Sequence, residues 1–482
     1  MNAYLIIDIG TGNVRVAVVS TAKKILHIER ADVHYEKDDK YPEALYFEPD
    51  VLWEQVIALT ERALAQVPGV CIKAITASSQ REGIVVLDRE GHSLIGLPNH
   101  DHRGREWESI LTDKHRVYAM TGRYPTSLFS ALKLVALKGR HPELAEKIGT
   151  FMSISDWAQY KLCGVMGYEH SQASETLLYD IEQGCWSDEL CEMFGIERSL
   201  LPSLHWSGTV LGNIMPQYAD KWHIDQGTPV IVGGADTQLA IKSTQPASGD
   251  IVIVSGTTTP VIKVTEEYLL DEKERTWTNR HVEGAQFILE TNCGVTGLNY
   301  QRLRECFYPN EGYDRIEAEL DGLKDPSCMA SLGSLLAGED TPLTTGGFVF
   351  NAPVSQQLSR ADFAWAILWD IACCIKENYE SLVDKRAYDR DYVWACGGGL
   401  QSKHLRTFIA GLIDKKIRIR QGFQQASVTG GAVICTEMLG GNDLPDADMD
   451  IVYPENQAHY HMLYEKWKKT RHGFRKMAET IE

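Results

Sequence analysis

The sequence lacks the features of a membrane protein or of a secreted, disulfide-bonded protein. None of its apolar runs approaches the ~20 residues that a membrane helix needs. The N-terminus has no basic region followed by an apolar stretch and a small-residue cleavage site, so we expect no signal peptide. The 11 cysteines are odd in number and form no C-x-x-C pair, which favours reduced thiols. We therefore predict a cytoplasmic protein without a membrane partner.

Positive charge is also scarce. The chain has 48 Lys and Arg against 66 Asp and Glu, which gives a formal net charge of −18. This balance disfavours nucleic acid as a partner, although a small anionic ligand can still bind at a local site. At 482 residues the chain is too long for one hydrophobic core, so we expect more than one domain.

A glycine turn near the N-terminus lacks the marks of two common phosphate loops. In YLIIDIGTGNVRVAVVS, residues 4–20, no lysine completes a Walker loop, and Arg15 replaces the third glycine of a dinucleotide loop. The β-branched residues that follow predict a β-hairpin. The N–H groups of residues 10–13 and the Thr11 hydroxyl can donate to phosphate, and Mg²⁺ would offset the repulsion from Asp8. The alternative is an ordinary hairpin whose Asp8 caps the turn.

A similar turn occurs about half the chain later. Residues 250–264, DIVIVSGTTTPVIKV, run from an apolar strand through Gly256 and Thr257 into a second apolar strand. The recurrence predicts two similar domains, each offering one phosphate hairpin to a shared cleft. A polar stretch with Pro and Gly at 241–250 indicates the boundary, so we expect domains at 1–246 and 247–482.

A glycine triplet marks a third segment. Residues 392–414, YVWACGGGLQSKHLRTFIAGLID, read as an apolar strand, three glycines and a helix. Apolar residues recur at helical spacing from Leu405 to Ile413, and Ser402 is suited to the N-cap. Gly397–Gly399 would let a flat ring or a phosphate approach the backbone. A tight strand-to-helix turn without a ligand would give the same pattern.

Together these segments resemble the sugar kinases of the FGGY carbohydrate kinase family over about residues 3–440. The resemblance implies an α/β fold with two ribonuclease-H-like (actin-like ATPase) domains flanking a central cleft. It also implies that the N-terminal domain binds sugar, that the C-terminal domain binds nucleotide, and that ATP and Mg²⁺ are the cofactors. The implied ATP contacts are Gly10, Thr11, Gly12, Asn13, Arg15, Gly256, Thr257, Thr258, Gly294, Thr296, Gly398, Gly399 and Ser402.

One acid matches the catalytic base of that family. GTPVIVGGADTQLA, residues 227–240, resembles the family's G-G-x-D segment and ends an apolar strand at Asp236. A sugar hydroxyl is a poor nucleophile, and a carboxylate within hydrogen-bond reach can accept its proton. We therefore predict that Asp236 is the base and that Asp236 and Asp8 lie at the metal. The alternative for Asp236 is an acid that caps a loop.

The predicted substrate residues lie in the N-terminal half. Gln80, Arg81 and Glu82 follow an apolar strand, and such side chains can donate to hydroxyls and accept from them. NHDHRGREW, residues 99–107, resembles the family's W-x-D-x-R segment and adds Asp101. The predicted set is Gln80, Arg81, Glu82, Asp101 and Asp236. The alternative for the first three is a surface turn with an ion pair.

Several residues depart from the family pattern in ways that bear on the identity of the substrate. Asn99, Leu128 and Pro260 replace aromatic residues that would cover the apolar edge of glycerol, which disfavours glycerol. Arg81 and Glu82 occupy the positions where xylulose kinases have Met-His, which disfavours xylulose as the substrate. The two histidines at 100 and 102 lack the further ligands of a metal site, and Lys133 is expected to be structural or solvated.

The pattern is most similar to that of bacterial autoinducer-2 kinases. R-E-G-I-V, I-S-D-W at 154–157 and D-x-Q-L at 236–239 are shared, whereas Gln425 replaces the family's Glu. The expected substrate is thus a linear dihydroxypentanedione, with a ketopentose or polyol kinase of the xylulose, ribulose, glycerol or erythritol type as alternatives. Two other classes stay open: an actin- or chaperone-like ATPase, and a sugar-binding regulator without catalysis. A homodimer is compatible with the sequence.

Overall fold

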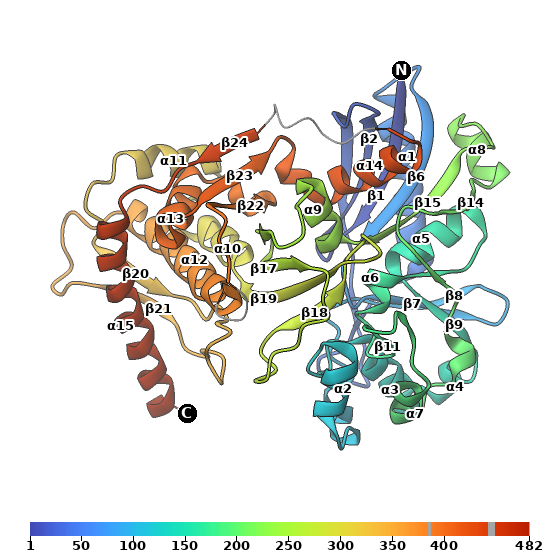
Figure 1. Cartoon of the computed structure of the whole chain (residues 1–482), viewed down its shortest axis with the longest axis horizontal. Helices are drawn as coiled ribbons and strands as arrows, with labels where there is room; N and C mark the ends of the chain where they lie inside the picture. Colours follow the sequence, from blue (N-terminus) through green and yellow to red (C-terminus); the bar gives the residue numbers. More distant parts are fainter. Residues whose placement is uncertain (384–386, 442–448, 482) are drawn as a thin grey trace. The chain divides into compact units, whose positions relative to one another are not determined.

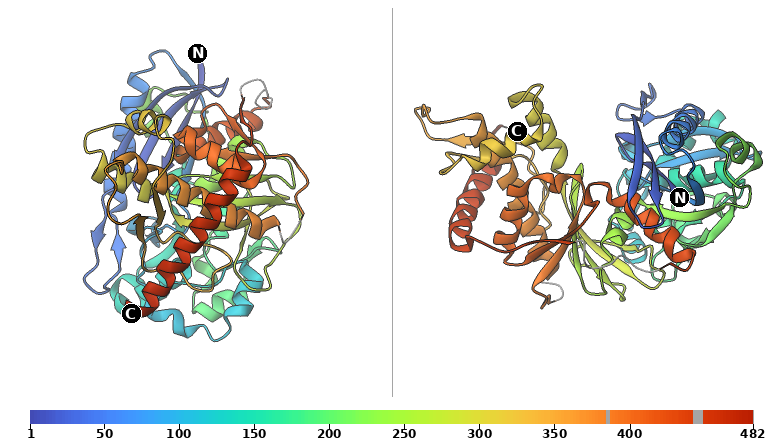
Figure 2. Two further views of the ribbon diagram at one scale, coloured as in Figure 1. Left: turned by 90° about the vertical axis from the view of Figure 1, so that its left-hand side faces the viewer. Right: turned by 90° about the horizontal axis from the view of Figure 1, so that it is seen from above.

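The computed structural model describes residues 1–383, 387–441 and 449–481. The chain forms two compact units (Figures 1 and 2). The first unit comprises Met1–Gln245, Thr265–Ile288 and Gln425–Pro445, and the second comprises Pro246–Val264, Leu289–Gln424 and Asp446–Glu482. The assignment of sugar to one domain and nucleotide to the other stays a prediction.

A six-stranded sheet organises the first unit. Its order is β14-β15-β6-β1-β2-β3, with β1 antiparallel to β2 and parallel to β6. The strands are β1 (Asn2–Ile9), β2 (Asn13–Ser20), β3 (Ile25–Asp32), β6 (Cys71–Ser79), β14 (Val210–Asn213) and β15 (Pro229–Ala235). The predicted hairpin at residues 4–20 is therefore confirmed.

Both faces of this sheet are covered, which explains why β1 is apolar on both sides from Ala3 to Ile7. Leu5 and Ile7 of β1 belong to a core that includes residues of α1 (Pro49–Ala65) and α5 (Ile154–Cys163). Tyr4 and Ile6, which point the other way, pack with residues of α9 (Asp236–Thr244) and α14 (Ala426–Met438). Figure 1 shows α14, from late in the chain, beside the first strands.

Smaller elements complete the first unit. A three-stranded sheet has the order β8-β7-β9 and shares a core with residues of α2, α3, α4, α6 and α7, whereas α8 belongs to the core beside α1. These elements are β7 (Ile84–Asp88), β8 (Ser93–Leu97), β9 (Ile148–Ser153), α2 (Lys114–Thr121), α3 (Ser130–Arg140), α4 (Pro142–Ala145), α6 (His170–Ala173), α7 (Asp188–Phe194) and α8 (Pro216–Trp222). Short strands are β4 (Glu36–Lys37), β5 (Leu45–Tyr46), β10 (Tyr168–Glu169), β11 (Tyr179–Asp180), β12 (Cys185–Trp186) and β13 (Leu204–His205).

A seven-stranded sheet carries most of its strands in the second unit. Its order is β18-β19-β17-β16-β22-β23-β24, with β16 antiparallel to β17 and parallel to β22. The strands are β16 (Ile251–Val254), β17 (Thr258–Thr265), β18 (Trp277–Arg280), β19 (Phe287–Val295), β22 (Tyr392–Cys396), β23 (Lys416–Arg420) and β24 (Met449–Val452). The second predicted hairpin is thus present and has the same pairing pattern as the first.

The helices of the second unit pack through buried aromatic residues. They are α10 (Gly297–Phe307), α11 (Tyr313–Asp321), α12 (Arg360–Val383), α13 (Lys403–Ile413) and α15 (Gln457–Ile481), with a β20 (Cys328–Ser331) and β21 (Gly347–Phe350) pair. Trp467 of α15 is buried and donates its indole N–H to Asp370 of α12 at 2.7 Å. This hydrogen bond holds α15 against α12 within the second unit.

Two further findings concern the chain as a whole. Every helix within the described residues is too short or too polar to cross a membrane. Among the same residues, all cysteines are free thiols, as the sequence predicts.

Candidate active site

Asp8 lies at the end of β1 and is completely buried. Its carboxylate pairs with Arg15, the opposite residue on β2, at 2.8 Å. It also accepts hydrogen bonds from the hydroxyls of Ser78 (2.6 Å) and Ser427 (2.9 Å). Arg15 in turn donates to the side chain of Gln425 at 2.8 Å. Asp8 is therefore held from β2, β6 and α14, which is more than a turn cap requires.

The tip of the first hairpin is linked to the predicted substrate segment. The turn is closed by the Gly10 N–H, which donates to the Asn13 carbonyl at 3.0 Å. The side-chain amide of Asn99 donates to the Thr11 hydroxyl at 2.9 Å, and the Asn99 N–H donates to the Gln80 side chain at 2.9 Å. Sequence reasoning treats Asn99 only as a missing tryptophan, whereas the structure gives it a connecting role.

The second hairpin, in the second unit, contacts two other predicted segments. The N–H of Thr296 donates to the Thr257 carbonyl at 3.1 Å, and the Thr259 and Thr296 hydroxyls are 2.7 Å apart. The N–H of Gly399 donates to the Ser255 carbonyl at 2.8 Å. Gly256 and Thr257 at the tip are exposed. The structure thus brings together three segments that the sequence predicts separately.

Close packing explains two of the glycines in the triplet. A Cβ atom at Gly397, whose φ is +101°, would lie 2.3 Å from the Ser255 carbonyl oxygen. A Cβ atom at Gly399 would lie 2.3 Å from the Ser255 hydroxyl. Because Cβ atoms do not approach oxygen so closely, the loop needs glycine there to pack against the hairpin. No such contact constrains Gly398.

The helix after the triplet forms as predicted. Ser402 caps α13 and accepts from the Leu405 N–H at 3.2 Å. The apolar face from Leu405 to Ile413 is buried. Gly294, another of the implied ATP contacts, has a φ of +67°, a conformation that glycine adopts readily.

Asp236 is the first residue of α9, directly after β15, and is partly buried. Its carboxylate accepts from the N–H of Thr237 at 2.6 Å and from the Thr237 hydroxyl at 3.2 Å. Burial raises the pKa of Asp236 to about 6, and repulsion from Asp8 adds to the effect while Arg81 opposes it. Asp236, Asp8 and Arg81 therefore interact within the first unit.

The predicted substrate residues Arg81 and Glu82 belong to a buried charge cluster. Their exposed fractions are 8% and 6%, so the surface-turn alternative is wrong. Arg81 lies 3.9 Å from Glu82 and 3.7 Å from Glu175. Glu82 has a left-handed backbone, with φ of 60°. Burial and, to a smaller extent, the charge of Glu175 raise the pKa of Glu82 to about 8.

Glu175 and Arg123 are functional candidates that sequence reasoning missed. Arg123 is completely buried and donates to Glu175 at 2.5 Å. The Arg123 guanidinium also lies over the Trp277 ring, 4.4 Å from its centroid. The two residues are 52 positions apart in segments without a recognisable motif, so only the fold shows that they pair.

Asp101 and Lys133 make internal bonds. The Asp101 carboxylate is completely buried; it accepts from Arg103 at 2.7 Å and from the Leu45 N–H at 3.0 Å. Its predicted contact with substrate stays a prediction. Lys133 donates to the Pro98 carbonyl at 2.6 Å and to the Glu82 carbonyl at 3.0 Å, which confirms a structural role.

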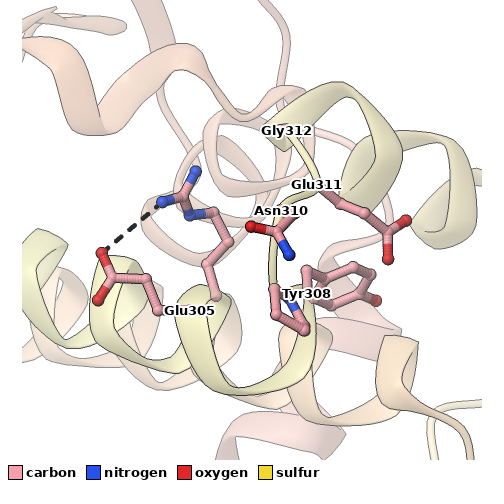
Figure 3. A pocket seen from close by; sticks show the side chains of 7 residues that line it. Glu305, Tyr308, Asn310, Glu311 and Gly312 are labelled. Carbon is pink, nitrogen blue, oxygen red and sulfur yellow. Dashed lines mark ion pairs between the residues drawn. The ribbon is translucent and has the colours of Figure 1, made fainter.

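A separate pocket of about 560 Å³ lies at the end of α10 in the second unit. Its lining runs from Arg304 to Gly312 and includes an ion pair between Arg304 and Glu305 at 3.7 Å (Figure 3). None of the predicted site residues lines it. No group of three or more His, Cys, Asp or Glu suited to a metal ion occurs among the described residues.

Comparisons with known proteins identify the family. Residues 3–242 match the N-terminal domain of the FGGY family of carbohydrate kinases. YoaC of Bacillus subtilis (strain 168), which carries a provisional sugar-kinase name, is 48% identical over 98% of this chain and 97% of that protein. The chain therefore belongs to the FGGY family, and it is a carbohydrate kinase.

Further comparisons give a more distant relative and two solved structures that share the fold. Autoinducer-2 kinase of Salmonella typhimurium is 28% identical over 68% of this chain, a match that spans only 63% of that protein. Among solved structures, ligand-bound xylulose kinase from Lactobacillus acidophilus has a TM-score of 0.83 at 18% identity, with 98% of each chain covered. Plasmodium falciparum glycerol kinase with ADP has a TM-score of 0.84 at 18% identity, with 97% of each chain covered. The fold is the predicted α/β fold of two ribonuclease-H-like, actin-like domains.

Proposed function

We propose that this kinase transfers the γ-phosphoryl group of ATP to a hydroxyl of a small sugar or polyol-like substrate, with Asp236 as the general base. The observation that carries the proposal is the position of Asp236 at the start of α9, where both of its hydrogen bonds go to one carboxylate oxygen; burial there raises its pKa to about 6, and Asp8 and Arg81 act on its charge. A base with a pKa near the working pH is largely ionised, yet still accepts a proton effectively.

The chemistry assigned to the chain is simple. Arg81 and Glu82 orient the substrate by donating to its hydroxyls and accepting from them. The Asp236 carboxylate accepts the proton of the reacting hydroxyl as its oxygen bonds to the γ-phosphorus. The bond between that phosphorus and the bridging oxygen breaks, and ADP leaves with the electron pair. The products are a sugar phosphate, ADP and a protonated Asp236, which then releases its proton to water.

The residues present suit a magnesium ion. Mg²⁺ commonly binds through one or two carboxylates together with water and substrate phosphates. Asp8 and Asp236 repel each other across the first unit's site, and a cation beside them would relieve that repulsion. We propose that these two residues hold the ion, which would neutralise charge on the phosphates when bound.

The proposed nucleotide contacts follow the two hairpins. The turn at Gly10–Asn13, where Gly12 is exposed and the other three residues are partly buried, and the exposed tip at Gly256 and Thr257 offer backbone N–H groups of the kind that bind phosphate. We place the remainder of ATP against Thr296 and the loop at 398–402. We further propose a cytoplasmic enzyme without nucleic-acid or membrane partners, for which a homodimer is compatible.

The first candidate substrate is a linear dihydroxypentanedione of the autoinducer-2 type. Support comes from the Salmonella relative and from Asn99, which makes polar contacts where glycerol-type sites carry an aromatic ring. Ketopentoses, glycerol and erythritol are the alternatives.

An ADP-release assay over a panel of acceptors tests the proposal. The panel contains glycerol, erythritol, D-xylulose, L-ribulose and dihydroxypentanedione, and product phosphorylation is checked by mass spectrometry. We expect release that depends on one acceptor and is lost in Asp236→Asn, with Asp188→Asn on the exposed surface as the matched control. Acceptor-independent hydrolysis would favour an ATPase, and acceptor binding without turnover would favour a regulator.

A further inference from the structure

Strand β18 lies in the segment Thr265–Ile288, which belongs to the first unit. Its side chains point to two opposite faces. Thr278 and Arg280 point one way: the Thr278 hydroxyl donates to the Leu269 carbonyl, and Arg280 donates to the Ile181 carbonyl at 2.8 Å. Because side chains alternate along a strand, Trp277 and Asn279 point the other way, and His281 continues their line. We call Trp277, Asn279 and His281 the β18 row.

The middle residue of this row is buried without a partner. Asn279 has an exposed fraction of 0%, and neither its amide oxygen nor its amide nitrogen has a hydrogen-bond partner among the residues that the structure describes. Gln238 of α9, two residues after Asp236, is equally buried and equally unpartnered at both side-chain atoms. Buried amides normally bond to protein or to ordered water, so these four atoms require an explanation.

The first end of the β18 row adjoins the charge cluster at Arg81. Trp277 lies beneath Arg123, which pairs with Glu175. Further along the strand, the backbone N–H of Arg280 donates to the Ser174 hydroxyl at 3.2 Å. Ser174 directly precedes Glu175. Figure 1 shows β18 close to α6, from which this segment continues.

The other end of the row adjoins the helix that carries Asp236. A Cβ atom at Gly234, two residues before Asp236, would lie 2.8 Å from the Val282 side chain. Glu283 pairs with Lys242 of α9. Asn279 therefore lies on a strand that connects the Arg81–Glu175 cluster with the segment around the proposed base.

We propose that Asn279 and Gln238 form a second hydrogen-bonding subsite for the phosphate acceptor, next to Arg81, Glu82 and Asp236. This inference rests on the proposed kinase function and extends it. A carboxamide both donates and accepts, as a hydroxyl or a hydroxyketone does, so two unpartnered amides suit a neutral oxygen-rich carbon chain. Burial holds the pKa of His281 at about 3, so this neighbour adds no positive charge that would favour an anionic group.

The subsite also sets a minimum length for the acceptor. Arg81, Glu82 and Asp236 already provide enough donors and acceptors for the three hydroxyls of glycerol. The additional amides would therefore contact only longer acceptors, such as erythritol, a ketopentose or dihydroxypentanedione. Trp277 offers an apolar ring to the carbon skeleton of such a chain.

The test compares Asn279→Ala with the matched control Thr278→Val, which alters the adjacent residue on the opposite face. For the longer panel acceptor that is turned over fastest, we expect Asn279→Ala to raise KM about tenfold, as the loss of one or two hydrogen bonds predicts. The value of kcat should change less than threefold, and the KM for ATP should not change. Gln238→Ala should behave alike, whereas Thr278→Val should leave the acceptor KM unchanged.

Glycerol serves as an internal control, because its KM, where measurable, should be the same in Asn279→Ala and in the parent. Asn279→Leu, an apolar residue of similar size, covers the case in which the alanine variant does not fold. An acceptor KM unchanged in a folded Asn279 variant, or an equal penalty on glycerol, would overturn the subsite.

Calorimetric binding of the same panel separates this inference from the proposed function. If no acceptor is phosphorylated but one binds, and its affinity falls about tenfold in Asn279→Ala, the subsite stands while the kinase proposal fails. If acceptors are phosphorylated and both variants bind them as the parent does, the subsite alone is wrong.

Discussion

Replacing Asp236 with Asn tests both its proposed role and the physical reason for it. Asn keeps the oxygen that accepts from the Thr237 N–H at 2.6 Å, so the local structure should persist. It removes the negative charge and the ability to take a proton. We expect kcat to fall by ~10²-fold or more, because the general base is lost. The affinity for ATP should be largely kept.

The same variant should change stability in a pH-dependent way. The pKa of Asp236 rises from 3.8 to about 6 on folding, a shift that corresponds to roughly 3 kcal/mol at most. Because the folded-state pKa lies above the unfolded-state value, the unfolded chain ionises first. The parent protein therefore loses stability as the pH rises from about 4 to about 6, and it does not regain it above.

Asn is neutral throughout, so Asp236→Asn should be more stable than the parent at pH 8 and equally stable at pH 4. Since Asp236 is partly exposed, we expect a gain of about 1–3 kcal/mol at pH 8. Denaturant unfolding at both pH values measures it, and the pH profile of parental kcat should rise through about 6. Near-parental turnover would remove Asp236 as the base. A stability gain over the parent that is no larger at pH 8 than at pH 4 would refute the buried-charge explanation.

Three further substitutions test other parts of the site. Asp8→Asn should weaken magnesium-dependent ATP binding at least tenfold, with the acceptor KM kept within about twofold, as titration calorimetry and kinetics can measure. Glu175→Gln removes the charge that helps to raise the pKa of Glu82 to about 8, so the pKa of Glu82 should fall. The pH at which the acceptor KM improves should therefore be lower than in the parent, as steady-state assays can measure. Asp101→Ala removes the 2.7 Å partner of the buried Arg103, which keeps Asp38 at 3.1 Å, and should cost about 1–3 kcal/mol of unfolding free energy. A folded, equally stable variant with only a raised acceptor KM would instead identify Asp101 as a substrate ligand.

Local patterns predicted much of the fold. The hairpin at residues 4–20 follows from period-two apolar residues on both sides of a glycine turn, and α13 follows from apolar spacing and a serine cap. Both signals lie within a few positions of the element that they predict. The repeated strand–Gly-Thr–strand pattern likewise gave two hairpins with the same pairing.

The surroundings of the site residues could not be predicted in this way. Asp8 accepts from Ser78 and Ser427, which are 70 and 419 positions away. The pairing of Arg123 with Glu175 similarly depends on tertiary packing rather than on spacing. Asn279 carries no motif, and only burial without a partner distinguishes it from other polar residues. Sequence patterns thus indicate which residues carry the chemistry, while their electrostatics come from the packing.

The hydrogen bonds around the two acids explain why Asp236, and not Asp8, is suited to accept the proton. Asp8 is completely buried and already bonds to Arg15, Ser78 and Ser427. These three donors enclose the Asp8 carboxylate, so a substrate hydroxyl has less access to it than to Asp236. Asp236 is partly exposed, and both of its hydrogen bonds come from Thr237 and go to one oxygen. Its second oxygen is therefore the atom to which we assign the substrate hydroxyl.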